Sequence, residues 1–225
     1  MRPRERLLKL GAQALSNDEL LAIFLRIGSK SRNAIELAGD ILKETGGIRN
    51  LLFSNINDLD KFKGFGMAKW AQLQACYELV KRALEEELSE KSVINSPGIL
   101  REFLQTAIGH LEYEVFACLY LNSANELIEF KELFRGTQTH TSVYPKEIAK
   151  EALLKNACAV IVAHNHPSGN PLPSNEDIAL TQILKHSLNL IDINLLDHCI
   201  LTKNGFFSFV DDPALFNLIF RESEH

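Results

Sequence analysis

The sequence predicts an all-α domain followed by an α/β domain with a mixed sheet. Residues 16–82 show helical apolar periodicity with short loops, whereas after residue 97 short β-branched runs alternate with helical segments. Between them, residues 85–92 are charged and poor in apolar side chains, and Ser96-Pro97-Gly98 follows. We therefore expect two domains, over residues 1–88 and 95–225.

Helix start and stop signals divide the first domain. A capping box at residues 16–19 begins a helix that we expect Gly28 to end. A second helix is predicted over residues 33–45, before a Gly-Gly pair, and a long third one over residues 67–87. Several helices joined by short loops predict an all-α bundle.

The second domain combines strand and helix patterns. Short apolar or alternating runs predict strands, and longer segments opened by proline predict helices between them. Such interleaving favours a mixed sheet with helices packed on its faces. In order, we expect a helix over 97–107, strands over 116–121 and 127–134, a helix from Pro145, a buried strand over 157–163, a helix after Pro173, and strands over 191–201 and 206–210.

The composition indicates a globular cytoplasmic protein without a membrane partner. No apolar run approaches the roughly 20 residues that a membrane-spanning helix needs, and residues 1–6 lack the apolar stretch of a signal peptide. The four cysteines stand far apart without a Cys-x-x-Cys pair. Three of the four have apolar neighbours, so we expect reduced core residues and not a disulfide framework or a cysteine zinc knuckle.

The net charge of -5 is unevenly distributed. Residues 1–83 hold 14 Lys and Arg against 9 Asp and Glu, whereas residues 84–225 hold 10 against 20. A basic segment of this kind fits contact with a polyanion, and it fits an ordinary solvated surface equally well.

A pair of histidines marks the candidate site. His164-Asn165-His166 lies where the predicted buried strand ends, at the edge where sites on such sheets gather. Residues two apart in extended backbone project to the same side, so both imidazoles can reach one ion. A Pro- and Gly-rich loop then delivers Asp177 in the first turn of the next helix. Two imidazoles and one carboxylate leave a fourth tetrahedral position for water, as in catalytic zinc sites.

Each of these residues has a plainer explanation by itself. An isolated His-x-His is mostly a surface or core feature, and Ser174-x-x-Asp177 is also a helix capping box. Their combination at one strand end favours a metal site. The His-x-Glu and Pro-Cys-x-x-Cys pattern of zinc deaminases is missing, and so is the His-Glu-x-x-His of zincins.

The spacing of His164, His166, Ser174 and Asp177 resembles the JAMM (MPN+) metalloprotease motif. The wider sequence resembles the bacterial RadC family, whose C-terminal domain is JAMM-like, and the resemblance covers nearly the whole chain. It implies a three-layer α/β/α domain of the cytidine-deaminase-like JAMM fold. The segments that carry it are Leu133-Phe134-Arg135-Gly136-Thr137, Ala163-His164-Asn165-His166-Pro167-Ser168-Gly169 and Leu196-Asp197-His198.

The resemblance also implies roles for single residues. His164, His166 and Asp177 become ligands of one zinc ion per chain, and Ser174 becomes a hydrogen-bond donor to the oxyanion of the tetrahedral intermediate. Glu114 takes the role of the upstream glutamate, the general base, because it starts the first strand as the family's Glu-x-Phe does. Glu112 lies on the same side and is its rival.

Other polar residues receive lesser roles. Asn165 and Ser168 are expected to shape the loop after the buried strand. His198 falls in a predicted strand, and we interpret it as a structural histidine or one that supports a ligand. The family commonly has Val-His-Pro where this sequence has Val143-Tyr144-Pro145, and His140 stands too far upstream to replace that histidine.

The first domain contains a candidate nucleic-acid motif. Phe62-Lys63-Gly64-Phe65-Gly66-Met67-Ala68-Lys69 resembles the hairpin of a helix-hairpin-helix motif, with Gly64 and Gly66 allowing a tight turn. Backbone N–H groups at the start of the next helix would meet a phosphate, and Lys63 and Lys69 would add charge without reading base sequence. A hairpin that only packs or binds protein is the alternative, and Trp70 is expected in the core.

The function predicted from the sequence is hydrolysis of an amide, peptide or isopeptide bond by zinc-activated water, with a protein or peptide as substrate. The alternative is a DNA-binding accessory protein of repair or recombination with a structural or regulatory zinc site. A phosphoesterase would usually need two metal ions, and one His-x-His-Asp set supplies a single site.

Overall fold

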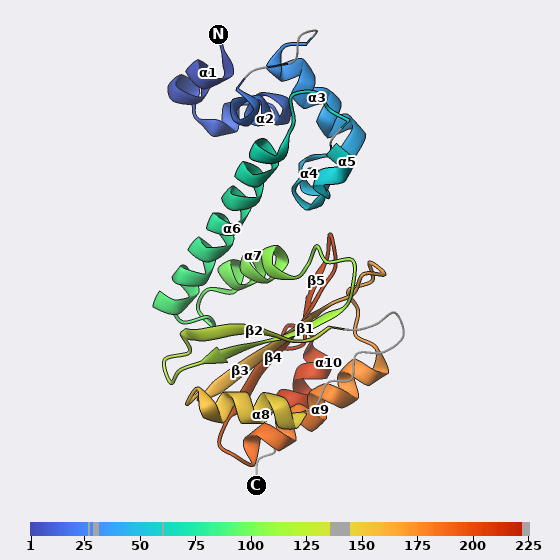
Figure 1. The fold of residues 1–225 in the computed structure, drawn as a ribbon. Helices are drawn as coiled ribbons and strands as arrows, with labels where there is room; N and C mark the ends of the chain where they lie inside the picture. Colours follow the sequence, from blue (N-terminus) through green and yellow to red (C-terminus); the bar gives the residue numbers. More distant parts are fainter. Residues whose placement is uncertain (27, 29–31, 60, 136–144, 222–225) are drawn as a thin grey trace. The chain divides into compact units, whose positions relative to one another are not determined.

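The computed structural model describes residues 1–225 apart from 27, 29–31, 60, 136–144 and 222–225. The chain forms two compact units, residues 1–80 and residues 81–225, and the division falls within helix α6 (Met67–Glu90) (Figure 1). Among the described residues, no helix has both the length and the apolar character needed to cross a membrane. Each unit has its own apolar core.

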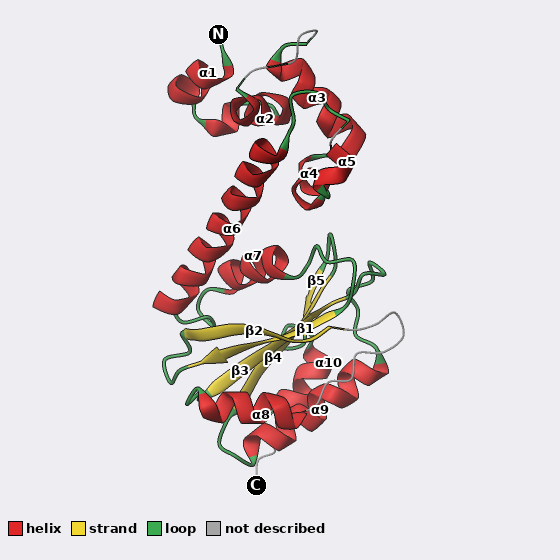
Figure 2. Ribbon diagram, in the orientation of Figure 1, coloured by secondary structure: helices red, strands yellow, loops and turns green. Residues whose placement is uncertain are grey.

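The described part of residues 1–80 is helical, as predicted (Figure 2). Ser16 caps α2 by accepting a hydrogen bond from the Glu19 backbone at 3.3 Å, and Asn33 caps α3 in the same way. Gly46 ends α3 with a φ of 78°, a left-handed conformation that glycine adopts without strain. The helices are α1 (Pro3–Leu10), α2 (Asn17–Leu25), α3 (Ala34–Thr45), α4 (Ile48–Phe53), α5 (Ile56–Leu59) and the start of α6, with a 3-10 turn over Ala12–Ala14.

Two details of this unit differ from the sequence-based prediction. Helix α2 ends at Leu25 and not at Gly28, because Arg26 already adopts a φ of 63° that stops the helix. Helices α1, α4 and α5 were not placed individually: α1 buries none of its residues, and α4 and α5 are only six and four residues long. Trp70 packs against the core as expected, and its indole N–H donates to the Ser54 carbonyl at 3.1 Å.

Unit 81–225 is built on a five-stranded mixed sheet, which confirms the predicted fold class. The strand order is β2-β1-β3-β4-β5, and only the β3–β4 pair is parallel. The strands are β1 (Val115–Leu121), β2 (Leu127–Arg135), β3 (Ala159–Asn165), β4 (Asn194–Leu201) and β5 (Phe206–Ser208).

Helices cover both faces of this sheet and make three layers (Figure 2). Helix α7 (Pro97–Ala107) packs on one face, against the side chains of Ala117, Leu119 and Leu121. Helices α8 (Pro145–Leu154) and α9 (Asn175–Asn189) pack on the other face, against Phe116, Cys118 and Tyr120. Alternate residues of β1 therefore pack into the apolar cores on opposite faces of the sheet, as the two-residue period of a strand requires.

Some local features of this unit differ from expectation. Strand β3 begins two residues later than predicted and runs through His164 to Asn165, so His164 lies within the strand. The C-terminal turns α10 (Pro213–Leu215) and η2 (Phe216–Phe220) were not predicted. Cys118 and Cys199 are buried, but Cys76 and Cys158 are exposed, so the expected core position is wrong for these two; all four are free thiols.

Candidate metal centre

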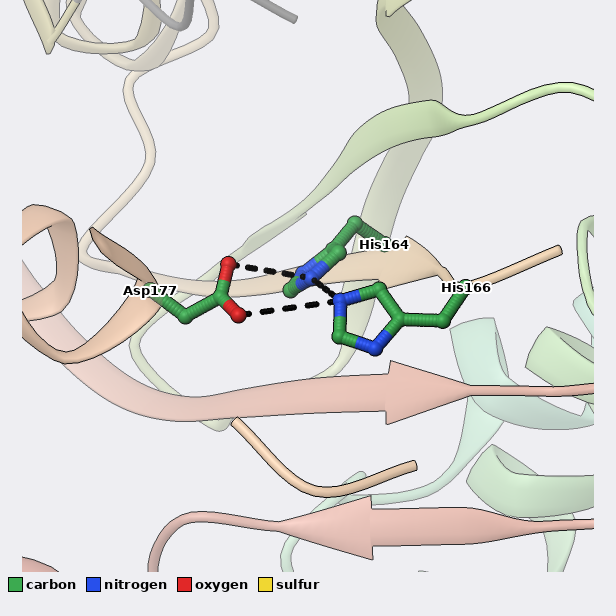
Figure 3. A group of neighbouring side chains, drawn as sticks. All are labelled: His164, His166 and Asp177. Atoms are coloured by element: carbon green, nitrogen blue, oxygen red, sulfur yellow. Dashed lines mark hydrogen bonds and ion pairs between the residues drawn. The ribbon is translucent and has the colours of Figure 1, made fainter. Parts of the chain in front are cut away.

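The two histidines of the motif meet at the end of β3. His164 is 1% exposed on the face of the sheet that α9 covers, and its ring stacks on Phe116 at 5.9 Å between centroids. His166 follows on the same side of the chain, and its Nε2 lies 2.8 Å from Nε2 of His164 (Figure 3). His164 near the end of β3 and His166 directly after it therefore point toward one position, as the two-residue period of extended backbone predicts.

Asp177 reaches the same point from the first turn of α9. Its Oδ1 lies 3.2 Å from His164 Nε2, and its Oδ2 lies 3.6 Å from His166 Nε2. These two distances and the 2.8 Å between the imidazoles are close to the spacing of about 3.3 Å that tetrahedral zinc with N and O ligands gives between neighbouring donor atoms. Within the described residues, His164, His166 and Asp177 are the group placed to share a metal ion.

Ser174 orients Asp177. It is the N-cap of α9, its backbone N–H donates to Asp177 Oδ2 at 2.8 Å, and its hydroxyl donates to the same oxygen at 2.6 Å. The Asp177 N–H donates back to the Ser174 hydroxyl at 3.1 Å. The predicted capping box is thus formed by the same side chains as the metal motif, and it leaves Oδ1 to face His164.

A tight turn fixes His166. Its carbonyl accepts from the Gly169 N–H at 3.1 Å across Pro167-Ser168, and Gly169 has a φ of 90°, which favours glycine. The turn brings the Asn170 carbonyl to 2.8 Å from His166 Nδ1. Because a carbonyl can only accept, Nδ1 carries the proton, and neutral His166 presents a lone pair at Nε2. A lone pair and a carboxylate facing one point suit a cation, so these residues fit zinc.

The electrostatics of the group agree with this geometry. Burial alone would raise the pKa of Asp177, but the adjacent imidazoles of His164 and His166 outweigh it and hold that pKa well below its ordinary value. The neighbouring Asp177 carboxylate raises the pKa of His166, burial opposes this, and the charge of Glu114 adds a smaller increase. Asp177 is therefore ionised at neutral pH, and the site attracts positive charge.

Glu114 stands directly before β1 and is half-buried, whereas Glu112 is exposed. The structure brings Glu114 near enough for its charge to act on His166. Asn165 fixes this segment, because its amide oxygen accepts from the Val115 N–H at 2.7 Å and its amide nitrogen donates to the carbonyls of Leu111 and Tyr113, each at 3.0 Å. Asn165 was expected to shape its own loop; instead it ties residues 111–115 to the strand that carries the histidines.

His198 lies beside the metal group on β4 and was expected to be a structural or supporting residue. Its Nε2 is 2.8 Å from His164 Nδ1, and its Nδ1 is 2.6 Å from the hydroxyl of Thr181. Burial lowers the pKa of His198 well below its ordinary value, so the ring is neutral. Thr181 and Asn170 were not found from the sequence, because a threonine inside a helix and a backbone carbonyl give no motif.

The candidate nucleic-acid residues lie in the hairpin between α5 and α6. Gly64 has a φ of 101°, and Gly66 faces open space, since an added Cβ would meet nothing within 4 Å. Lys63 is exposed. The ammonium of Lys69 donates to the Gly64 carbonyl, so it closes the hairpin in this structure.

Some predicted features lie outside the described residues. These are Gly136 and Thr137 of the resemblance, His140, and Val143 and Tyr144 of the departure from Val-His-Pro. Pro145 is described and begins α8, as predicted.

Comparison with known families agrees with the fold. The RadC-like JAB domain family matches residues 94–214, and the UPF0758 N-terminal family matches residues 1–71. The second unit is thus a JAB-type domain, with a JAMM-type metallohydrolase-like fold. The chain belongs to the UPF0758 (RadC) family, which confirms the resemblance found in the sequence.

Relatives match along almost the whole chain. A UPF0758 protein of Janthinobacterium sp. (strain Marseille) is 50% identical over 214 residues, which cover 95% of this chain and 96% of the relative. One of Herminiimonas arsenicoxydans is 48% identical over 214 residues, with the same coverage, and one of Aromatoleum aromaticum is 50% identical over 204 residues, 91% of each chain. These relatives carry the name of the UPF0758 family.

Proposed function

We propose that the protein is a zinc-dependent hydrolase that cleaves amide bonds, in a peptide or isopeptide linkage. The observation that carries the proposal is the convergence of His164 Nε2, His166 Nε2 and the two oxygens of the Asp177 carboxylate, at distances of 2.8 to 3.6 Å. Two imidazoles and one carboxylate are a ligand set of catalytic zinc sites, which keep the fourth position open. When bound there, zinc would supply a water of lowered pKa and would polarise a carbonyl oxygen.

The other residues of the site would handle the proton and the substrate. Glu114 is proposed as the general base, because its charge acts on His166 and Asn165 holds its segment against β3. A carboxylate that is not itself a ligand can take a proton from the nucleophilic water and return it to the leaving amine. Glu112, which is exposed, is the weaker candidate.

Ser174 has two possible tasks. Its hydroxyl donates to Asp177 Oδ2 at 2.6 Å, which supports a task in orienting a ligand. Donation to the oxyanion of a tetrahedral intermediate remains part of the proposal, and it requires the hydroxyl to turn away from Asp177. Because the described residues provide one His-His-Asp group, the site fits a one-metal hydrolase better than a two-metal phosphoesterase.

Metal removal tests this proposal. The full chain would be stripped with a chelator and incubated with a library of peptides and isopeptide-linked peptides, with cleavage read by mass spectrometry. We expect cleavage to stop on chelation and to return when about one equivalent of zinc per chain is added back, because the ion supplies the nucleophile. Cleavage that persists in metal-free protein would contradict the proposal.

Contact with DNA through the first unit is a second proposal. It rests on the exposed Lys63, the open backbone at Gly66 and the excess of 14 basic over 9 acidic residues in residues 1–83. We expect weak duplex binding that falls with salt, with a slope smaller by about one in Lys63→Ala and unchanged in the control Lys146→Ala, an exposed lysine of α8. Fluorescence anisotropy over a salt series measures the DNA affinity and its salt dependence. Equal salt slopes in Lys63→Ala and Lys146→Ala would show that the hairpin does not contact DNA.

A further inference from the structure

A chain of side-chain contacts runs from one candidate ligand to another. It starts at His164 Nδ1, which lies 2.8 Å from His198 Nε2, and continues from His198 Nδ1 to the Thr181 hydroxyl at 2.6 Å. The Thr181 hydroxyl donates to the Asp177 carbonyl at 2.5 Å, one helical turn earlier in α9. These hydrogen bonds thus connect His164 on β3, through His198 on β4, to helix α9, which carries Asp177.

The contact between the Thr181 hydroxyl and the Asp177 carbonyl determines which atom donates in each of the other hydrogen bonds. A carbonyl oxygen can only accept, so the single proton of the Thr181 hydroxyl goes to Asp177. The hydroxyl oxygen must then accept from His198, which places the His198 proton on Nδ1 and leaves a lone pair on Nε2. That lone pair requires a donor, so His164 carries its proton on Nδ1 and presents a lone pair at Nε2, toward the metal position.

We propose that His198 and Thr181 are positioning residues that hold His164 in the tautomer with the proton on Nδ1, ready to bind a metal ion through Nε2. The inference rests on the proposed metal site. The zinc-free protein already holds this tautomer, because the final acceptor is the backbone carbonyl of Asp177, which cannot donate a hydrogen bond. The Asn170 carbonyl likewise accepts the proton on His166 Nδ1.

The residues around His198 and Thr181 keep their hydrogen bonds in one arrangement. His198 and Thr181 are each 0% exposed, so water does not compete for their hydrogen bonds. The His198 ring stacks on Phe209 with centroids 4.7 Å apart, and Phe116 meets its edge at 5.7 Å. Backbone anchoring comes from Asp197, whose Oδ1 accepts from the His198 N–H at 2.7 Å. A ring packed on two sides and bonded at both nitrogens keeps one orientation.

A matched pair of variants separates positioning from packing. Thr181→Val keeps the branched shape and removes the hydroxyl, whereas Thr181→Ser keeps the hydroxyl and removes a methyl group. Zinc affinity of the full chain would be measured by chelator competition, and the tautomer of His164 in the zinc-free protein by nitrogen-15 NMR of the imidazoles. We expect zinc binding to weaken about tenfold in Thr181→Val and to stay within about twofold in Thr181→Ser.

The tautomer provides a readout that packing alone would not change. In wild type and Thr181→Ser, His164 Nδ1 should show the shift of a protonated nitrogen, and in Thr181→Val this state should give way to a mixture. His198→Gln is a second variant, since its amide can still accept from His164; it should bind zinc more tightly than His198→Ala. Equal zinc affinity and an equal tautomer in Thr181→Val and wild type would overturn the inference.

Two outcomes distinguish a wrong positioning role for His198 and Thr181 from a wrong metal site. If wild type binds no zinc while His164 is protonated on Nδ1, the hydrolase proposal is wrong and the tautomer assignment stands. If wild type binds zinc but Thr181→Val and Thr181→Ser weaken it equally, the two residues act through packing, and the positioning role is wrong.

Discussion

Glu114→Gln should lower kcat for amide hydrolysis by about 10²- to 10⁴-fold while the protein keeps its zinc. Glutamine has nearly the same shape, but its amide cannot take a proton from the attacking water. The segment itself should not move, because Asn165 holds residues 111–115 through backbone groups that the substitution leaves unchanged. Initial rates on a cleaved library peptide, together with zinc content, measure the effect.

Glu112→Gln is the matched control for this substitution. Glu112 is two residues earlier on the same segment and is exposed, so its loss should change kcat by less than about twofold. Loss of activity in Glu112→Gln with full activity in Glu114→Gln would show that the base has been assigned to the wrong glutamate. Loss of zinc from Glu114→Gln would instead make Glu114 a ligand.

Asp177→Asn should weaken zinc binding by a factor on the order of 10³, because one of three ligands loses its charge and the site retains only two imidazoles. The capping contacts of α9 can largely survive, since an asparagine oxygen still accepts from the Ser174 N–H, 2.8 Å from Asp177 in the wild type. The fold should therefore persist without the metal. Chelator competition measures the affinity, and circular dichroism follows the helix content.

Glu176→Gln is the control for the charge at this helix end. Glu176 is an exposed acidic residue in the same first turn of α9, and its carboxylate is outside the metal group. Both substitutions remove one negative charge near the helix N-terminus, and the lost interaction with the helix dipole costs about 0.5 kcal/mol in each. If Glu176→Gln weakens zinc binding as much as Asp177→Asn does, the effect is general electrostatics and Asp177 is not a ligand.

The sequence predicted those parts of the site that depend on local signals. The two-residue spacing of His164 and His166 at the end of a strand, and the capping box that places Asp177, are properties of a few neighbouring residues. The same holds for the helix cap at Ser16 and for the alternation of strands and helices after residue 97. Such signals appear in one sequence without knowledge of the rest of the fold.

The supporting contacts could not be predicted, because they join residues far apart in the chain. His198 meets His164 only because β3 and β4 pair in parallel, with Val162 opposite His198. Asn165 reaches residues 111–115 because β1 and β3 are neighbours in the sheet. Local patterns did not fix this strand order, so the sequence suggested a supporting role for His198 without naming its partner.

The central claim is that His164, His166 and Asp177 hold one zinc ion, and diffraction at the zinc absorption edge tests it most directly. Crystals of the full chain grown with zinc should show one strong anomalous peak, about 2.0–2.2 Å from Nε2 of each histidine and from an oxygen of Asp177. A peak at other residues, or no peak between these three side chains in fully loaded protein, would contradict the account.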